Sequence, residues 1–295
     1  SGYRFGQSDE EITPVRESLN EIATTSQKGE ADLSISLPKV VKTAKPLEAK
    51  VLVRLAEPGG RTIERQVTLP VDLGLERIGI KPLFNGDRLG ESETAQFDVL
   101  MLGTDGKPEA ASGLVWQLNK LETNWQWYSR GGYWTFEPVT LTRKVADGKL
   151  EVAAEKPSRL EMPVKYGRYV LEVQSAGSAE VVSSVAFTAG WYSGSDRPDS
   201  PEQLDIALDK ETYQPGDTAK LRIAAKQGGK ALVAVLGNRL YAMQEVDVPT
   251  GGGDVSIPVG DNWGPGAYVT AILYRPMDEA LKRMPQRSLG LQWLA

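Results

Sequence analysis

Cysteine and histidine are both missing from this sequence of 295 residues. Without histidine there is no Ser-His-Asp or Cys-His catalytic group and no imidazole metal site, and without cysteine there is no thiolate ligand and no disulfide. The composition therefore does not fit a small secreted scaffold held together by disulfides. We expect that the chain is not an enzyme and that it has no catalytic, cofactor-binding or metal-binding residues and no cofactor.

Long apolar runs and concentrated charge are also missing. No apolar run approaches the roughly 18 residues that a membrane span needs, so we expect no direct membrane contact by this chain. The formal net charge of −5 argues against a nucleic-acid partner, which needs a concentrated basic face. The chain begins at Ser1-Gly2 within what reads as folded sequence, without a charged and then apolar signal segment. We therefore expect it to be a piece of a longer protein.

Alternation of apolar and polar residues is what the sequence does contain, and the stretch 208–223 (LDKETYQPGDTAKLRI) shows it best. Pro215 and Gly216 predict a type II turn, because one presets φ and the other accepts the positive φ that this turn requires. From Ala219 to Ile223 apolar and polar residues alternate, which predicts a strand with one face buried. A short strand, a Pro-Gly-Asp corner and an alternating strand are typical of the start of an immunoglobulin-like sandwich.

The same pattern continues through a domain that we expect over residues 201–295. The polar, turn-rich stretch 194–201 precedes it as a linker. Turns are predicted at 251–253 and 263–266, and a single helical turn at 277–283. The seven predicted strands are 206–208, 219–225, 231–236, 241–248, 255–259, 267–274 and 288–294.

A second domain is expected over residues 78–192, with about eight strands, enough for a closed sandwich. Tight turns are predicted at 105–107, at 129–132 and at Asp147-Gly148-Lys149. The side chains predicted to face inward are Phe97, Val99 and Met101, then Leu114, Trp116 and Leu118, and finally Tyr169, Leu171 and Val173.

The first segment, residues 1–77, holds fewer strands. Either a short helix over 8–22 or an extended stretch begins it. Alternation then predicts strands around 33–37, 47–55 and 63–71, with a hairpin turn at Pro58-Gly59-Gly60. This is about four strands, short of a sandwich, and we expect the missing strands to lie upstream. The segment would then have an exposed edge or an open core.

A set of stretches along the chain carries a resemblance to a known family. They are Gly59-Gly60-Arg61, 75–84 (LERIGIKPLF), the aromatic hairpin 116–139 with 143–148 after it, Tyr166-Gly167-Arg168-Tyr169, the corner 213–217, and 284–290 (MPQRSLG). In this order they resemble the macroglobulin (MG) domains of bacterial alpha-2-macroglobulins. The resemblance covers nearly the whole chain and depends on the ordered set, because no single motif decides it.

The resemblance implies an all-β fold of tandem immunoglobulin-like or fibronectin-like antiparallel β-sandwich (macroglobulin) domains. It also implies a periplasmic parent, anchored to the inner membrane, that acts in bacterial host defence as a broad-spectrum protease trap. In that family a target protease cuts a bait region, the molecule rearranges around the protease, and in many members a Cys–Gln thioester acylates it.

The part implied for this chain is that of a structural scaffold. Having no cysteine, the chain holds no thioester. Residues 285–294 resemble sequence that borders the bait-bearing domain, so we expect the bait beyond Ala295. The implied partners are the neighbouring domains of the parent and, through the intact parent, target proteases.

Another function stays open from the residues alone. An immunoglobulin-like binding module would use the aromatic residues from Trp125 to Phe136 to hold a cell-wall glycan or an extracellular ligand. That hypothesis requires Trp125, Trp127 and Trp134 to be open to solvent on one face. Cross-strand packing within one hairpin is the interpretation that we favour.

The remaining polar groups are interpreted as solvated surface. The acidic groups lack the loop pattern of a calcium site, and a carboxylate hydrolase would need two of them in one cleft. The Ser26-Gln27-Lys28 pair lacks a buried lysine pocket, and Gly251-Gly252-Gly253 lacks the Lys-Ser/Thr of a phosphate loop. The groups weighed are Asp9, Glu10 and Glu11; Asp196, Asp199 and Asp205; Glu151, Glu155 and Glu161; and the basic Arg275, Lys282, Arg283 and Arg287.

Overall fold

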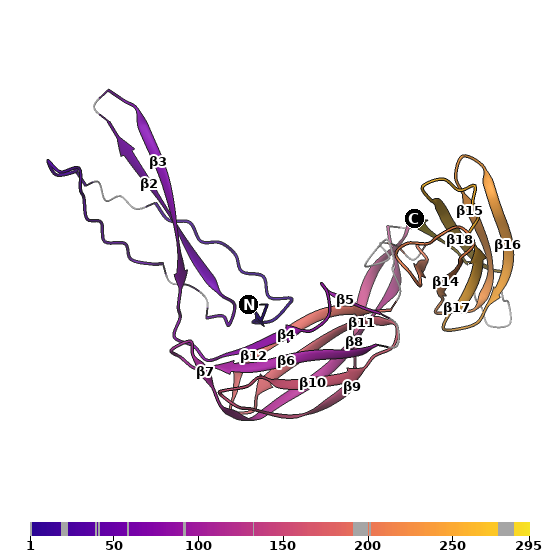
Figure 1. Cartoon of the computed structure of the whole chain (residues 1–295), viewed down its shortest axis with the longest axis horizontal. Coiled ribbons are helices and arrows are strands. Elements are labelled where there is room, and N and C mark those ends of the chain that lie inside the picture. Colours follow the sequence, from indigo (N-terminus) through magenta and orange to yellow (C-terminus); the bar gives the residue numbers. More distant parts are fainter. Residues whose placement is uncertain are drawn as a thin grey trace.

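The structure, a computed structural model, describes residues 2–18, 23–38, 40, 42–57, 59–90, 93–131, 133–190, 200, 202–276 and 286–295. Of the strand residues, the side chains of Trp127, Trp134 and Ala179 also lie outside this description. Every named element in these ranges is a β-strand, which confirms the all-β prediction (Figure 1). Within the same ranges, no helix has the length and apolar character that a membrane span requires.

Two sheets build a sandwich from the middle of the chain, which we call the second unit. One sheet has the order β1-β4-β6-β10 with β7 on β6, and the other has the order β5-β12-β11-β8-β9. All neighbours are antiparallel except β5 and β12, which run parallel. The strands of the first sheet are β1 (Arg4–Phe5), β4 (Arg77–Pro82), β6 (Thr94–Leu102), β7 (Pro108–Glu109) and β10 (Ser158–Pro163). Those of the second are β5 (Arg88–Leu89), β8 (Ala111–Arg130), β9 (Tyr133–Val152), β11 (Gly167–Ser175) and β12 (Ser178–Ala189).

Period-two alternation places the core of the second unit between its sheets. Along β6 every second side chain is buried, as the sequence predicts. The Phe97 ring is fully buried and lies 5.4 Å from Phe84 and 5.3 Å from Phe187 between ring centroids. Of the predicted inward residues only Trp116 is half-buried, and it packs against the edge of the core.

The start of the chain belongs to this sandwich as well. Strand β1 pairs with β4 of the second unit. The Gly6 amide donates to Ser183 Oγ over 2.9 Å, and the Ser8 amide donates to Ser184 Oγ over 2.8 Å. Arg4 and Phe5 therefore extend one sheet of the second unit, and Gly6 and Ser8 bond to β12 of the other, although the sequence analysis grouped these residues with the first segment. The boundaries 1–77, 78–192 and 201–295 stay a prediction.

The tight turn predicted at Asp147-Gly148-Lys149 is wrong. These residues lie inside β9, where Gly148 pairs with Trp116 of β8. The register shifts one residue between Leu118 and Asn119, so the irregularity is a bulge and the strand continues through it. A Cβ on Gly148 would lie 2.9 Å from Trp116 Nε1. The glycine is there because an indole ring covers the backbone.

The third unit is a second sandwich with its own core. Its sheets have the orders β13-β14-β17 and β16-β15-β18-β19. All seven predicted strands are present, and the predicted turn at 277–283 lies outside the described residues. The strands are β13 (Asp205–Leu208), β14 (Thr218–Ala224), β15 (Gly229–Leu236), β16 (Leu240–Val248), β17 (Gly253–Pro258), β18 (Ala267–Arg275) and β19 (Gln286–Leu294).

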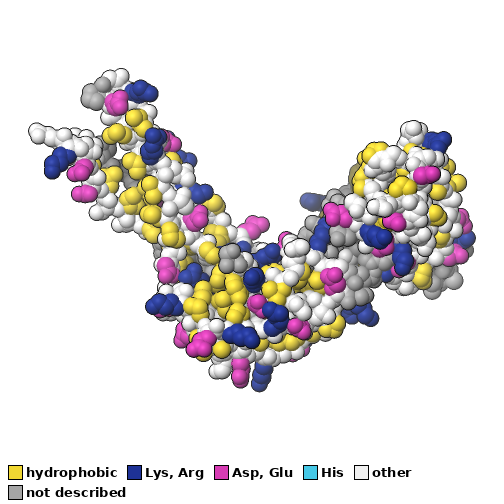
Figure 2. All heavy atoms as spheres, in the orientation of Figure 1, with side chains coloured by type: hydrophobic (Ala, Val, Ile, Leu, Met, Phe, Trp, Pro, Cys, Tyr) yellow, Lys and Arg dark blue, Asp and Glu magenta, His cyan; other side chains and the backbone are white. Residues whose placement is uncertain are grey.

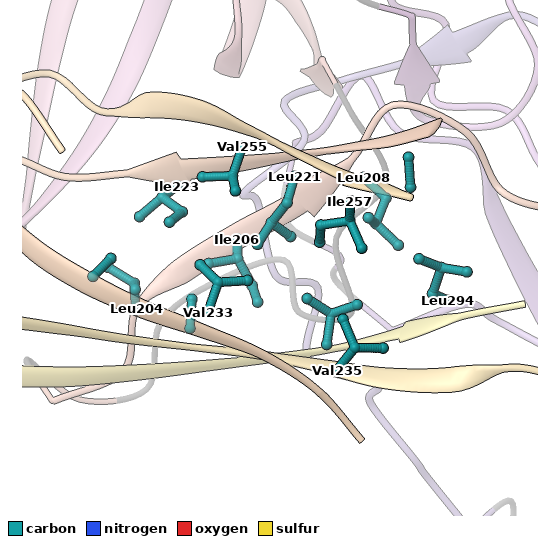
Figure 3. Packing of buried hydrophobic residues seen from close by; sticks show 14 of the residues in the cluster. Leu204, Ile206, Leu208, Leu221, Ile223, Val233, Val235, Val255, Ile257 and Leu294 are labelled. Atoms are coloured by element: carbon teal, nitrogen blue, oxygen red, sulfur yellow. The ribbon is translucent and has the colours of Figure 1, made fainter. Parts of the chain in front are cut away.

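Leucine, isoleucine and valine side chains from both sheets meet in this core (Figure 3). Leu221 and Ile223 from β14 and Leu294 from β19 are almost fully buried. Each such side chain stabilises the fold by about 1.5–3 kcal/mol relative to exposure to water. The corner before β14 forms as predicted, with Gly216 at a φ of 90° and the Asp217 amide donating to the Gln214 carbonyl over 3.0 Å.

The first segment differs most from its prediction. Strands β2 (Leu47–Ala56) and β3 (Thr62–Val71) form a two-stranded ribbon, and no third strand pairs with it among the described residues. The strand predicted at 33–37 is wrong, and the described residues from 10 to 18 are extended rather than helical. Apolar side chains along the ribbon stay open to solvent (Figure 2). The exposed ones are Leu52, Val53, Leu55, Val67 and Leu69.

Truncation of Phe97 tests the packing of the second unit. Phe97→Ala removes a fully buried ring, so we expect a loss of about 3–5 kcal/mol in the free energy of unfolding, measured with urea and tryptophan fluorescence. Val115→Ala is the matched control, because Val115 is exposed on β8. It should change stability by less than about 0.5 kcal/mol. An equal small effect of both substitutions would show that the two sheets are not packed as described.

Candidate functional site at the junction of the second and third units

A half-buried pair of polar side chains joins the second and third units. Tyr166, which immediately precedes β11, donates its hydroxyl proton to Asp205 Oδ2 over 2.8 Å. Asp205 is the first residue of β13 in the third unit. The Tyr166 ring packs closely against Gly190 of the second unit, since a Cβ on Gly190 would come 2.3 Å from its Cδ2 atom. The interpretation of Asp205 as a solvated acidic group is therefore wrong.

Burial dominates the electrostatics of this pair. It raises the pKa of the Tyr166 hydroxyl strongly, and the Asp205 carboxylate adds to the rise. It also raises the pKa of the Asp205 carboxyl, while the hydrogen bond from Tyr166 and the charge of Arg168 act in the opposite direction. Tyr166 is thus a neutral donor at physiological pH, and the Asp205 carboxylate sits where ionisation is costly.

Two basic side chains of the third unit flank the pair. The Arg222 guanidinium lies 5.7 Å from the centroid of the Tyr166 ring, within the range of a cation–π contact. Its Nε and Nη2 atoms donate to the two carboxylate oxygens of Asp254 over 2.8 and 3.0 Å. This bidentate pair fixes the guanidinium plane within the third unit.

Lys226 makes the other contact across the junction. Its ammonium group donates to the Thr123 carbonyl and to Asn124 Oδ1 on β8. Both residues lie in the part of the β8–β9 hairpin that extends beyond β11, whose pairing with β8 stops at Leu121 (Figure 1). Desolvation lowers the pKa of Lys226, and the negative charge of Glu122 opposes that change.

A groove of about 1050 Å³ lies beside the junction. It is lined by the loop between β4 and β6 and by Glu211 of the third unit. Its other acidic groups are already engaged, since Asp87 forms an ion pair with Arg4 at 2.7 Å and Glu93 accepts from the Gly90 amide at 3.1 Å. No cluster of three metal-ligating side chains occurs in the part of the chain that is described.

The other groups weighed from the sequence do not converge with this site. Ser26 Oγ accepts the amides of Lys28 and Glu30, so it caps a turn and its lysine neighbour is exposed. The Gly251 amide donates to the Ala225 carbonyl, and the Gly252 amide donates to the Pro249 carbonyl. These amides hold a turn together and do not face a ligand. Asp196, Asp199, Lys282 and Arg283 lie outside the described residues.

The aromatic hairpin shows one ring pair clearly. Trp125 is half-buried and meets Phe136 edge to face at 5.4 Å between centroids. Tyr133 near the tip is 81% exposed. The side chains of Trp127 and Trp134, which the binding-module hypothesis also needs, lie outside the described residues. The Trp125–Phe136 contact is cross-strand packing within one hairpin, as the sequence predicted.

Three family models match this chain one after another. Residues 1–72 match the bacterial alpha-2-macroglobulin MG5 domain, residues 79–191 match bacterial macroglobulin domain 6, and residues 204–295 match the alpha-2-macroglobulin bait region domain. The chain belongs to the bacterial alpha-2-macroglobulin family. The second unit is therefore MG6 and the third is the bait region domain. Alpha-2-macroglobulins are protease inhibitors rather than enzymes.

Similar proteins agree with this assignment. The alpha-2-macroglobulin of Escherichia coli (strain K12) is 30% identical over 98% of this chain, which covers 19% of that relative. The cryo-EM structure of native E. coli alpha-2-macroglobulin matches 99% of the chain at 28% identity, with a TM-score of 0.58 over 19% of its length. The crystal structure of Salmonella alpha-2-macroglobulin reacted with methylamine gives 28% identity and a TM-score of 0.56, with the same coverage of both chains. The chain thus spans about a fifth of the length of the relatives it matches.

One expectation from the resemblance needs correction. The resemblance implied that residues 285–294 only border the bait-bearing domain and that the bait lies beyond Ala295. The bait region domain model instead matches residues 204–295, so that domain is already present in this chain. Sequence reasoning placed it wrongly because its strands follow the same alternation as any macroglobulin sandwich. Asp205 was likewise missed, since its partner Tyr166 is 39 residues away.

Alkaline titration tests the burial of Tyr166. Because its pKa is raised on folding, the stability that its neutral hydroxyl contributes is fully present at pH 7 and below the unfolded value of about 10, and is lost as pH rises through the folded value. We expect the folded wild type and Tyr166→Phe to form the same number of phenolates between about pH 9 and 11, measured by ultraviolet difference absorbance. One additional phenolate in the wild type would mean that the hydroxyl is solvated.

Proposed function

We propose that this chain is part of a periplasmic protease trap, in which the bait region domain is the part that a target protease attacks and MG6 carries the resulting movement to the rest of the parent. The observation that carries the proposal is the order of MG5, MG6 and bait region domain along one chain. The proposal assigns no chemistry to the chain itself, and its role is mechanical.

The packing of the two sandwiches supports such a role. MG6 and the bait region domain each bury their own apolar cluster, and neither cluster contains a residue of the other. Each is therefore a stiff body, because close-packed cores deform little. Movement after a cut in the bait region domain would be concentrated at the junction, where the Tyr166–Asp205 hydrogen bond and the Lys226 contact connect the two bodies.

Covalent capture would depend on other parts of the parent. This chain has no cysteine and therefore no thioester. Steric enclosure is the inhibitory effect to which these domains contribute. A protease enclosed in this way still hydrolyses small peptides, while large proteins no longer reach it.

Protease capture by the full-length parent tests the proposal. The parent is mixed with an equimolar amount of trypsin, and hydrolysis of a small chromogenic peptide is compared with hydrolysis of a large protein. We expect protein hydrolysis to fall while peptide hydrolysis persists, together with a new cut in the parent on a denaturing gel. Trypsin with a chemically blocked serine is the control and should leave the parent uncut. Retention of both activities by active trypsin would refute the proposal.

Cell fractionation tests the periplasmic assignment. In cells that express the parent, we expect the protein to resist added protease until the outer membrane is permeabilised, and then to be degraded while a cytoplasmic marker survives. It should sediment with the inner membrane, as an anchored protein does. Release together with the cytoplasmic marker would contradict this localisation.

A further inference from the structure

The junction between MG6 and the bait region domain is polar. Contacts that cross it in the described part of the chain include the Tyr166–Asp205 hydrogen bond, the Arg222 guanidinium on the Tyr166 ring and the Lys226 ammonium on β8. The apolar clusters of the two domains stay separate. Domains that meet over a polar surface of this kind are expected to change their relative orientation easily. Individual polar side chains at this junction can therefore influence the orientation of the two domains.

The Tyr166–Asp205 hydrogen bond is partly buried, whereas the Lys226 contact is exposed. Burial is the largest influence on the protonation of both groups. A hydrogen bond to a charged acceptor is stronger than a neutral one, and removing one partner leaves the other buried without its bond. The contact from Lys226 is more exposed to solvent, and exposed ionic contacts contribute little to stability.

Opening of the junction would break the Tyr166–Asp205 hydrogen bond but would return both side chains to water. In the closed arrangement the Asp205 carboxylate gains the Tyr166 hydroxyl but loses water, and burial outweighs the hydrogen bond in setting its protonation. In an open arrangement both groups recover their hydration. Breaking the contact therefore costs one hydrogen bond but returns water to both groups, so the hydration of these groups offsets part of the cost of opening.

We infer that the Tyr166–Asp205 contact sets the orientation of the bait region domain on MG6, and that it is the contact that opens when these two domains move apart. The first half of the inference concerns this chain alone. The second half rests on the proposed function, since it assigns the opening to the rearrangement of the trap. Tyr166 and Asp205 are positioning residues in this scheme.

Distance measurements on this chain test the first half. The chain has no cysteine, so Lys149→Cys on MG6 and Ser256→Cys on the bait region domain give two unique attachment points, both exposed. Spin labels at these sites report the interdomain distance by pulsed electron paramagnetic resonance. For the doubly labelled chain with no further substitution, we expect a single narrow distribution of interdomain distances. In Tyr166→Phe and in Asp205→Ala, we expect that narrow peak to be lost.

A second tyrosine–aspartate pair provides the matched control. Tyr213 donates to Asp209 Oδ1 over 2.8 Å entirely within the bait region domain. Tyr213→Phe removes the same kind of bond, so it should leave the interdomain distribution unchanged. The double variant Tyr166→Phe with Asp205→Ala should be no broader than either single one, because both act on one interaction. An unchanged distribution in both single variants, with near-ultraviolet circular dichroism like the wild type, would overturn the inference.

The full-length parent separates this inference from the proposed function. Labels at the same two sites are followed while trypsin is added. We expect the narrow wild-type distribution to shift on cleavage, and Tyr166→Phe to show a shifted population before any protease is present. A parent that captures no protease, although the Tyr166→Phe effect is seen, removes the proposed function and keeps the positioning role. A parent that captures protease with an unmoved distribution removes the second half of the inference.

Discussion

Everything in this structure depends on the burial of one face of each strand. Because successive side chains point to opposite sides, every second residue of β6 or β14, each of them apolar, is buried in one core, and the residues between them are exposed or half-buried. MG6 and the bait region domain each close two sheets over such a core. The two cores do not merge, and the contacts described at the junction come from polar side chains. The same arrangement that makes each domain stiff makes their connection adjustable.

The sequence predicts well whatever follows from this alternation. The seven strands of the bait region domain are found where the pattern places them, because their apolar residues repeat with period two and Gly or Pro follows most of the runs. The corner at Tyr213–Asp217 is predictable for the same kind of local reason, since Gly216 supplies the positive φ that the turn needs. In these segments the turn residues and the alternation of apolar residues predict the same structure.

Features that depend on distant residues were not predictable. Gly148 reads as a turn in sequence, but its role is to leave room for the Trp116 ring 32 positions earlier, which the register of β8 and β9 places over it. Asp205 reads as one acid in a polar linker, and only the fold brings Tyr166 to it. Both residues are explained by a long-range contact with an aromatic side chain. Sequence patterns limited to neighbouring residues carry no information about such contacts.

The ribbon of β2 and β3 also alternates apolar and polar residues, but in the described part of the chain no second sheet packs on it. Its pairing puts Val53 opposite Arg65 and Val67 opposite Val51, so one face is mostly apolar, and part of it is open to water. A two-stranded ribbon is marginally stable in water on its own. Burial of this apolar face against another surface would therefore stabilise the ribbon. MG6 and the bait region domain have closed cores and can hold their shape through a rearrangement, whereas the order of this ribbon depends on what covers it.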